Sequence, residues 1–551
     1  MSVPPTFFVS DRRMLQHKCE WDADHIEKPD RLSALLDTIE SDRSLFAQCV
    51  RLPPAECPLS DILLVHSSEY IQRIREASSL PDLEAMEQFS SEHEDIYVNG
   101  KSWECALLSA GCAVKATEAL IETAKERAQN GESEAPNAFV AIRPPGHHAS
   151  QNDPCGFCLL NNVAICARKA RSLGVERVLI VDWDVHAAQG TQYCVEGDPE
   201  GILLLSIHRF ERGTFWPELP ESAIVHQYPN TINVPLNSVG CGDAEYAAFF
   251  HCIVLPIIHQ WRPGLVLVSC GFDAGIGDPQ GQMEVSPAGF GYMTGLLAQQ
   301  GVPLCLLLEG GYFLPSVCHG ALQSLRALVQ RAPPIRHFCQ LSPSPDFMNT
   351  LFQIQFVHRH KWPFFARWLQ ILNALRAKRK LRPIEVPQSE YFGQRQKPLA
   401  QPQPTRGQYP PREKEEELKF ELRIQTMLNE YENRESKKRD QIELSISKNE
   451  KSCSLLLTLP DRTSSVGFPL SDQFHFLMLY FFILLPLAFQ EYDIKTTEGK
   501  SLPLTFSEVE ILLGQIGGEN NAGNEEEFKV EISSLESITE AFPKLASQLL
   551  N

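Results

Sequence analysis

A run of apolar and β-branched residues, Val178 to Val181, leads directly into Asp182, Asp184 and His186. Such a run is typical of a buried parallel strand, and the polar residues follow at its carboxyl end. Asp184 and His186 are two positions apart, so an extended chain points both side chains to the same face. Carboxylates and imidazoles bind divalent metals and transfer protons. The stretch therefore predicts a metal or acid–base site.

Chemically active residues also follow three further apolar runs. AIRPPGHHA contains His147 and His148, VSCGFDAG contains Asp273, and LLEGGYF contains Tyr312. A single histidine after a strand is more often a hydrogen-bonded core residue than a ligand. Several carboxylates and imidazoles buried together are a different case, because without a compensating ion each would cost several kcal/mol. The combination predicts a bound cation.

Three of these residues, Asp184, His186 and Asp273, form a plausible zinc shell. Three protein ligands leave a fourth position for water or substrate, which is the arrangement of a catalytic zinc site. His147 and His148 then remain for acid–base work. Tyr312, after a Gly-Gly turn, is placed to donate a hydrogen bond to a developing oxyanion. A two-manganese hydrolase needs more bridging carboxylates than these strand ends offer.

The elements that must position these residues occupy about the first 335 residues. Short apolar runs such as VERVLIVDWD, GILLLSIH and VPLCLLLEGG alternate with helix-length amphipathic segments. This alternation predicts an α/β fold with a parallel sheet covered by helices on both faces. Active residues of such sheets gather at the carboxyl ends of the strands.

Composition narrows the function classes. The 551 residues are enough for two or three domains, and 50 Lys and Arg against 69 Asp and Glu give a net charge of −19. This charge disfavours direct nucleic-acid binding and favours cationic substrates or basic partners. MSVPPTFFVSDRR at the N-terminus has no apolar run of signal-peptide length, which predicts cytoplasmic or nuclear residence. The 16 cysteines are then expected to be mostly reduced.

Cys155 and Cys158 have CxxC spacing in DPCGFCLLNN. A redox pair is one interpretation. Neither a second CxxC nor a histidine pair lies nearby to complete a zinc clip, and we favour two buried or half-buried structural thiols.

At this point the motifs carry a family resemblance. RPPGHH, GFCLLNNVAI, VDWDVH, SIHRFERGTFWP, GFDAGIGDPQGQM and LEGGY resemble, in this order over about residues 15 to 335, the motifs of the zinc-dependent histone deacetylases, class IIb in particular. The resemblance implies the three-layer arginase/deacetylase fold with an eight-stranded parallel sheet. It also implies hydrolysis of acetyl-amides to acetate and a free amine.

The resemblance also implies roles for single residues. His148 matches the general base that later protonates the leaving amine, and His147 is its electrostatic partner, buttressed by Asp182. Tyr312 matches the oxyanion donor. Asp182 and Ser206 match a structural potassium site, for which the alternative is ordinary hydrogen bonding at the strand ends.

The substrate channel is read from the same resemblance. Phe157 and Trp216 match the aromatic pair that packs on the acyl-lysine stem, where CH₂ groups gain from apolar burial. Asp95 matches a rim carboxylate that accepts hydrogen bonds from substrate amides. Arg31 matches an arginine that lines an acetate-exit channel, with a structural ion pair as the alternative.

The sequence departs from the family pattern after His186. Ala187 and Ala188 replace the usual His-Gly, which removes a histidine that is not a zinc ligand in the family. Loss of such an outer residue can reduce affinity or activity by about 10- to 100-fold. Ala188 is also a concern if the loop requires positive φ. Gln189 can still hold His148 by a hydrogen bond, as in the polyamine-deacetylase branch.

Two features bear on the substrate. The polyamine branch carries a glutamate in the GDPxGxM loop where this chain has Gln280, which lacks charge attraction for a polyamine. CEWDADHIEKPDRL also lacks the inserted turn of that branch and has the length found in the tubulin-deacetylase branch. We therefore expect a lysine deacetylase acting on histone tails, tubulin or other acetyl-lysine proteins. Deacetylation of acetylated polyamines or other small acetylated amines is the second hypothesis, and an inactive acyl-lysine or partner binder, suggested by Ala187 and Ala188, is the third.

Beyond the catalytic domain, expected at residues 1–340, the composition changes. Residues 341–383 predict an amphipathic helical extension with a basic run at Arg376 to Arg382, and residues 384–411 a Pro/Gln-rich extended linker. Residues 412–551 begin with a charged helix candidate and resemble a degenerate second deacetylase-like domain, because LYFFILLPLAFQE superposes on FFHCIVLPIIHQW. Residues 474–489 are too short for the roughly 20-residue membrane span, so we expect a buried helix there and no membrane contact.

Overall fold

The computed structural model describes residues 3–132, 134–332, 343–366, 369, 391–395 and 399–434, and four short strands between 442 and 532. The chain divides into two compact units. The first comprises Met1–Gly242, Trp261–Pro334 and Gln388–Leu428, and the second comprises Asp243–Gln260, Ile335–Pro387 and Asn429–Asn551.

An eight-stranded sheet forms the centre of the first unit. Its strands are β1 Thr6–Val9, β2 Cys49–Arg51, β3 Asn137–Val140, β4 Val178–Asp182, β5 Ile202–Arg209, β6 Thr231–Leu236, β7 Leu265–Cys270 and β8 Leu304–Leu308. Their order in the sheet is β2-β1-β3-β8-β7-β4-β5-β6, and every pairing is parallel. Strands β3, β4, β7 and β8 are buried along their whole length, because their continuous apolar sequences are covered on both faces.

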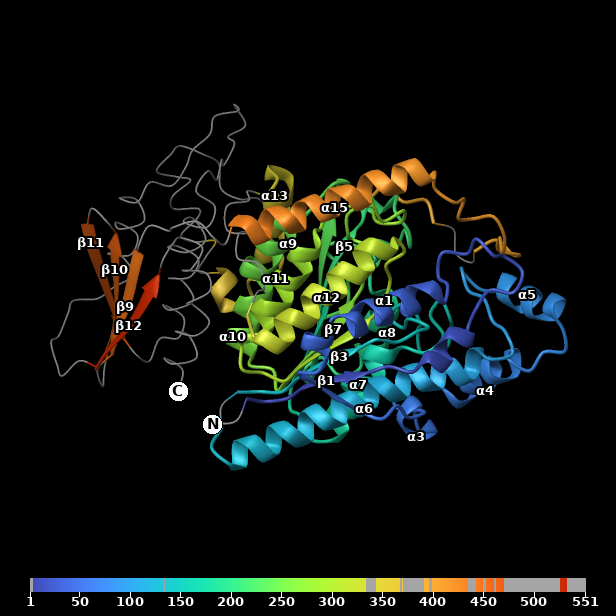
Figure 1. Ribbon diagram of the computed structural model, residues 1–551, viewed down its shortest axis with the longest axis horizontal. Coiled ribbons are helices and arrows are strands. Elements are labelled where there is room, and N and C mark those ends of the chain that lie inside the picture. The colour runs from blue at the N-terminus through green and yellow to red at the C-terminus, as the bar shows by residue number, and fades with distance from the viewer. Residues whose placement is uncertain are drawn as a thin grey trace. The chain divides into compact units, whose positions relative to one another are not determined.

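Helices cover both faces of this sheet. The helices of the first unit are α1 Asp30–Ser41, α2 Arg43–Phe46, α3 Leu59–Ile62, α4 Ser68–Ala77, α5 Leu83–Ser91, α6 Ser102–Gln129, α7 Asn162–Ser172, α8 Gln189–Val195, α11 Pro287–Ala298, α12 Leu314–Gln330 and α15 Lys414–Arg434, with short 3-10 turns η1 Arg12–Gln16, η2 Glu211–Gly213 and η3 Pro220–Ser222. Helices α6 and α7 pack together on one face, while α1, α11 and α12 form a layer on the other (Figure 1). The predicted three-layer α/β fold is confirmed.

The second unit contains α9 Asp243–Phe249, the π-helical turn η4 Phe250–Val254, most of α10 Leu255–Trp261, and α13 Pro345–His358. The α13 N-terminus docks on α9, where the Ser344 amide donates to Glu245 Oε1 at 2.7 Å. Strands β9 Ile442–Lys448, β10 Ser452–Leu459, β11 Arg462–Pro469 and β12 Glu526–Ile532 form an antiparallel sheet in the order β11-β10-β9-β12. This pairing differs from the parallel sheet of the first unit.

The domain boundaries expected from the sequence differ from the units at several positions. Asp243–Gln260, inside the expected catalytic domain, belongs to the second unit. A boundary at residue 340 with a linker at 384–411 leaves out Gln388–Leu428, which belongs to the first unit. The described residues 391–395 and 399–412 form neither helix nor strand, yet they hydrogen-bond to residues of that unit. The Pro/Gln-rich composition predicted an extended segment without helix or strand, but it did not predict these tertiary contacts.

Several predictions for the C-terminal third fall on other residues. The basic run Arg376 to Arg382 and the repeat candidate at 479–491 both lie outside the described residues. Residues 474–489, weighed above as a membrane span, lie outside them too. Within the part of the chain that the structure describes, every helix is too short or too polar to cross a membrane.

Candidate active site

The four strands that carry the predicted site residues are neighbours at the centre of the sheet. Strand β3 leads to His147 and His148, β8 to Tyr312, β7 to Asp273, and β4 to Asp184 and His186. Because all four strands are parallel, their carboxyl ends meet at one edge. The sheet order therefore brings together residues that are up to 165 positions apart in the sequence.

Asp184, His186 and Asp273 converge as the sequence predicts. Nδ1 of His186 lies 3.1 Å from Oδ1 of Asp184 and 3.3 Å from Oδ2 of Asp273. All three residues are buried and offer ligand atoms within 4.8 Å of one another. A second group, His147, His148 and Asp184, meets the same distance criterion. The two groups share Asp184, and the surroundings of His147 and His148 indicate which group could hold a metal.

The residues around Asp273 fit a bound metal ion. Oδ2 of Asp273 is buried and accepts no hydrogen bond from a described residue. Burial and the neighbouring Asp184 carboxylate raise the pKa of Asp273 to about 7, although the His186 ring beside it lowers this pKa. A bound cation would compensate the charge of the two carboxylates and would occupy the open acceptor. Carboxylate oxygens and imidazole nitrogens are both zinc ligands, and three protein ligands with an open fourth position are the arrangement of a catalytic zinc site.

Two glycines let the backbone approach these carboxylates. A Cβ atom at Gly271 would lie 2.1 Å from Oδ2 of Asp184, and one at Gly310 would lie 2.2 Å from Oδ2 of Asp273. The Gly310 amide also donates to Oδ2 of Asp184 at 2.9 Å. The glycines that end the β7 and β8 runs are therefore required by the site as well as by the turns.

His147 and His148 have different partners. Nδ1 of His147 donates to Oδ2 of Asp182 at 3.0 Å, whereas Nδ1 of His148 donates to Oε1 of Gln189 at 2.7 Å. Their rings lie 3.8 Å apart. Since Nδ1 of His148 carries a proton for the amide oxygen, its Nε2 holds the free lone pair.

The two partners give the histidines opposite protonation. Burial alone would lower the pKa of His147, but the carboxylates of Asp184 and Asp182 outweigh it and raise that pKa well above its usual value. Burial and the adjacent rings of His147 and His186 lower the pKa of His148 well below its usual value. One histidine is thus a cation and the other a neutral base. An imidazolium offers no lone pair to a metal, so the raised pKa of His147 favours the first metal group, which does not contain it.

Asp278 holds the backbone at Tyr312 by hydrogen bonds. Its Oδ2 accepts from the backbone amides of Tyr312 at 2.6 Å and Phe313 at 3.2 Å, and its Oδ1 accepts from Gln280 N at 2.8 Å. Burial raises the pKa of Tyr312 well above its usual value, so the phenol keeps its proton. Asp278 lies in the motif GFDAGIGDPQGQM but had no predicted role. Its position as an acid in a turn-rich segment was the signal that could have identified it.

Glu309 is a second residue that the sequence analysis did not assign. Its Oε2 accepts from the amides of Gly146 at 2.7 Å and His147 at 3.2 Å. It is completely buried, and it holds the turn that presents the histidine pair. An acid that ends the apolar run of β8 was the signal that could have identified it.

Phe157 and Trp216 border the histidine and tyrosine side chains. The Trp216 ring lies 4.6 Å from that of His148, and the Phe157 ring lies 5.7 Å from that of Tyr312, both edge to face. Between them Gly156 has a φ of +51°. A Cβ atom at Gly156 would lie 2.6 Å from Cδ2 of His148 and 2.8 Å from Cη2 of Trp216.

Gly156→Ala should therefore reduce activity strongly. The added methyl group must displace His148 or Trp216, and a displacement of about 1 Å at a reacting group can reduce the rate about 100-fold. Gly131→Ala is the matched control, because Gly131 also has positive φ, +73°, but a Cβ there meets nothing within 4 Å. Both variants should lose about 1 kcal/mol of stability. Equal kcat/KM for the two variants would contradict the assigned contact.

Asp95 and Gln280 lie in the loops near these residues. The Asp95 backbone has a φ of +52° and its carbonyl accepts from Phe157 N at 2.8 Å. Burial raises the pKa of Asp95 to about 6. Gln280 is half-buried, and its carbonyl accepts from Arg209 Nη1 at 3.1 Å.

Arg31 forms a buried ion pair. Its Nη1 donates to Oε1 of Glu27 at 2.8 Å, and its Nη2 donates to the Glu309 carbonyl at 2.5 Å. Arg143 binds the same Glu27 with its Nε and Nη2. The guanidinium of Arg31 also lies 4.9 Å from the centroid of the Tyr312 ring. Both the ion pair and a position beside the site are therefore observed.

Asp182 and Ser206 are register partners on β4 and β5. Oδ1 of Asp182 accepts from Asp184 N at 3.1 Å, and the Ser206 hydroxyl pairs with Nδ1 of His208 at 2.9 Å. These are ordinary hydrogen bonds at strand ends. Such bonds were the alternative to a potassium site at these two residues.

The Ala-Ala departure does not strain the loop. Ala188 has a φ of −79°, so this position does not require glycine. Both alanines are buried, and Ala187 O accepts from Gln189 N at 2.9 Å. Ala188 was a concern only if the loop required positive φ, and this condition is not met.

Cys155 and Cys158 form no disulfide. Burial raises the pKa of both thiols well above the usual value, which keeps them protonated and unreactive. Sγ of Cys155 accepts from Nε2 of Gln189 at 3.7 Å. This contact fixes the orientation of the amide that holds His148.

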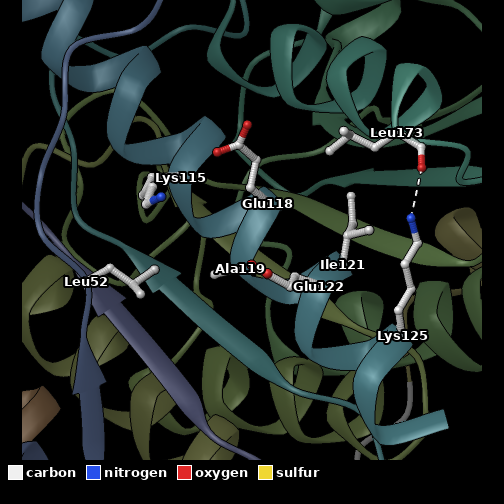
Figure 2. A pocket seen from close by; sticks show the side chains of 8 residues that line it. All are labelled: Leu52, Lys115, Glu118, Ala119, Ile121, Glu122, Lys125 and Leu173. Atoms are coloured by element: carbon white, nitrogen blue, oxygen red, sulfur yellow. Dashed lines mark hydrogen bonds between the residues drawn. The ribbon is translucent and has the colours of Figure 1, made fainter. Parts of the chain in front are cut away.

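A separate hollow lies on the outer face of α6. Lys115, Glu118, Glu122 and Lys125 project around it, and Lys125 Nζ donates to the Leu173 carbonyl at 3.0 Å (Figure 2). The residues that line it include none of the predicted site residues.

Comparison with known proteins agrees with this geometry. The model of the histone deacetylase domain matches residues 25–328. Polyamine deacetylase HDAC10 of Homo sapiens is 39% identical over 340 residues, which cover 60% of this chain and 49% of that protein. Histone deacetylase 15 of Arabidopsis thaliana is 33% identical over 377 residues, 67% of this chain and 65% of that protein. The chain spans about half the length of several curated relatives that it matches.

A solved structure supports the fold assignment. The crystal structure of the HDA15 HD domain superposes with a TM-score of 0.58 at 32% identity, and the match covers 67% of this chain and 98% of that domain. The domain match extends over more than half of the 551 residues, and it contains all the strand-end residues described above. The chain belongs to the histone deacetylase family.

Proposed function

We propose that this protein is a zinc-dependent hydrolase that removes acetyl groups from amines. The observation that carries the proposal is the convergence of Asp184, His186 and Asp273 beside two adjacent histidines whose Nδ1 atoms pair with Asp182 and Gln189. These three residues would hold the zinc ion. A zinc ion bound there polarises an acyl carbonyl and lowers the pKa of a water molecule.

The protein's own groups then divide the proton transfers. His148, neutral and with a free Nε2, accepts the proton of the attacking water and returns it to the leaving amine. His147, held as a cation by Asp182, stabilises negative charge that develops beside it. The Tyr312 phenol donates a hydrogen bond to the developing oxyanion, a contact worth roughly 3 kcal/mol in comparable sites.

For the substrate we propose acetyl-lysine in proteins. Phe157 and Trp216 provide an aromatic wall for the aliphatic stem, and neutral Gln280 does not attract a polyamine as a glutamate would. Acetylated polyamines are the alternative, and several relatives are named polyamine deacetylases. An inactive acyl-lysine binder is the third candidate, although Ala188 adds no strain that would favour it.

The remaining proposals follow from the family. Histone tails, tubulin or other acetylated proteins are the proposed partners, and cytoplasm or nucleus the proposed location. Arg31 is proposed to line an exit path for acetate in addition to its ion pair. A structural potassium ion at Asp182 and Ser206 stays a prediction.

Acetate release tests the proposal. The zinc-loaded protein is incubated with an acetyl-lysine peptide and, separately, with an acetylated polyamine, and His148→Ala serves as the blank. Turnover of the peptide above the blank is the expected result, with a higher kcat/KM than for the polyamine. Preference for the polyamine would overturn the substrate, and no release from either would overturn the activity.

A further inference from the structure

A segment of the predicted linker runs along the rim of the candidate active site. We call residues 399–412 the strap; they belong to the first unit (Figure 1, orange chain beside α5). In chain order, the strap hydrogen-bonds to Glu92, Ser91, Glu87, Asp22, Asp95 and Gly277. These contacts, together with Trp21 Nε1, which donates to the Thr405 carbonyl at 3.1 Å, define the path of the strap.

Tyr409 brings the strap to the mouth of the site. Its phenol donates to Oδ2 of Asp95, and its ring lies 6.0 Å from Phe157 and 5.3 Å from His25. Phe157 in turn lies 5.7 Å from Tyr312. A single aromatic ring therefore separates Tyr409 from the proposed oxyanion donor.

The rim beneath Tyr409 is held in a fixed conformation. Asp95 and Phe157 have φ angles of +52° and +66°, a left-handed conformation that non-glycine residues adopt only when their surroundings enforce it. The amides of Gly156 and Phe157 donate to the carbonyls of Glu94 and Asp95 at 3.0 and 2.8 Å. The Asp95 carboxylate is thus presented at a defined position. The Tyr409 phenol occupies Oδ2 of this carboxylate, so an N–H group that approaches the same oxygen competes with the phenol.

Arginines hold the chain on both sides of Tyr409. Before the strap, Arg395 Nη2 binds Oε2 of Glu94 at 2.6 Å, and Oε1 of this glutamate accepts from Trp216 Nε1 at 2.9 Å. At the end of the strap, Arg412 donates to the Gly277 carbonyl, and its guanidinium lies 5.0 Å from the Phe420 ring centroid. The anchors connect the strap to Glu94, which binds Trp216, and to the loop between β7 and α11, whose Asp278 binds the Tyr312 backbone amide.

We propose that Tyr409 is a specificity-determining residue, because its phenol occupies the rim acceptor Asp95. A substrate with amide N–H groups beside its acetylated side chain, such as a peptide, must displace this phenol to bind Oδ2 of Asp95. An acetylated alkylamine without such groups enters without displacing it. This inference rests on the proposed function and refines its substrate class: protein substrates bind at reduced affinity while the strap is in place.

Peptide binding to Tyr409→Phe tests the inference. The variant keeps the ring and loses the hydroxyl donor, so the Kd of a fluorescein-labelled acetyl-lysine peptide should fall about tenfold, as expected for one competing hydrogen bond. The Kd of N-acetylbutylamine, measured by competition, should stay within about twofold. Binding is measured on the zinc-loaded full chain carrying His148→Ala, so that the peptide is not consumed.

Two controls separate the phenol's effect from a general loosening. Tyr391→Phe removes the same hydroxyl from a tyrosine that donates to the Glu218 carbonyl at 2.6 Å, and it should not change the peptide Kd. Asp95→Gly removes the acceptor at a position whose φ suits glycine, and in this background Tyr409→Phe should have no further effect.

Several outcomes would overturn the inference. They are an unchanged or weaker peptide affinity of Tyr409→Phe, an equal gain in Tyr391→Phe, or no peptide binding by any variant. Acetate assays on the same chains without His148→Ala distinguish failure of the inference about Tyr409 from failure of the proposed function. A tenfold gain in peptide affinity without any acetate release would sustain the strap and refute the hydrolase, whereas acetate release with unchanged peptide affinity would do the reverse.

Discussion

His148→Ala should reduce kcat for acetate release by about 10²- to 10⁴-fold, the usual contribution of a positioned general base. His148 is 5% exposed, and its Nδ1 is bound to Gln189, so only Nε2 is available to take a proton. The variant should still bind zinc, because the proposed ligands are Asp184, His186 and Asp273. Kinetics and metal analysis of the same preparation measure both expectations.

His360→Ala provides the matched control, because His360 is an exposed histidine remote from these residues in the sequence. It should retain the kcat and zinc content of the wild type. If His148→Ala lost its zinc together with its activity, the second cluster of His147, His148 and Asp184 would have to be the metal site instead.

Glu27→Gln should destabilise the protein by about 3–5 kcal/mol, the usual effect of removing one partner from a buried ion pair. The variant leaves two guanidinium groups, those of Arg31 and Arg143, without their counter-charge at positions no more than 1% exposed. Thermal unfolding measures the effect, with an expected fall of the midpoint by roughly 10 °C. Glu104→Gln is the control, because the Lys101–Glu104 pair is about half exposed and should contribute well under 1 kcal/mol.

The same ion pair predicts a pH dependence. Burial alone would raise the pKa of Glu27, but Arg143 and Arg31 outweigh it and hold that pKa well below its usual range. The stabilisation is therefore fully present above the unfolded-state pKa of about 4.3 and is lost as the pH falls toward the folded-state value. The stability difference between wild type and Glu27→Gln should shrink below about pH 4. A difference that stays constant down to pH 3 would contradict the assignment.

The sequence was sufficient for the parallel sheet and for the cluster at its edge. Continuous apolar runs end in Asp184, Asp273 and His148, and parallel strands place such ends along one edge. The apolar pattern of the strands was therefore enough to predict that these residues lie close together in the fold. Asp278 and Glu309 escaped assignment because each acts through backbone amides that only the folded loops bring within reach.

Tyr409 could not have been identified from local pattern. It lies in a Pro/Gln-rich stretch that composition describes as a linker, and its contact with Asp95 spans 314 positions. At Ala188 the family motif suggested a problem that the structure does not show. The substitution for glycine raised the question of strain, but the backbone there has a φ of −79°, which alanine can adopt. Long-range contacts and backbone angles both depend on the fold, which residue types alone do not specify.

The most direct test of the central claim is a zinc titration of the chelator-treated protein with acetate release as the readout. We expect no acetate release without metal, and full recovery at one zinc per chain. Asp273→Asn should neither bind zinc with wild-type affinity nor recover, because a neutral amide replaces the buried carboxylate of a proposed ligand. Undiminished acetate release after complete metal removal, or one tightly bound zinc per chain without release from any acetylated amine, would contradict the account.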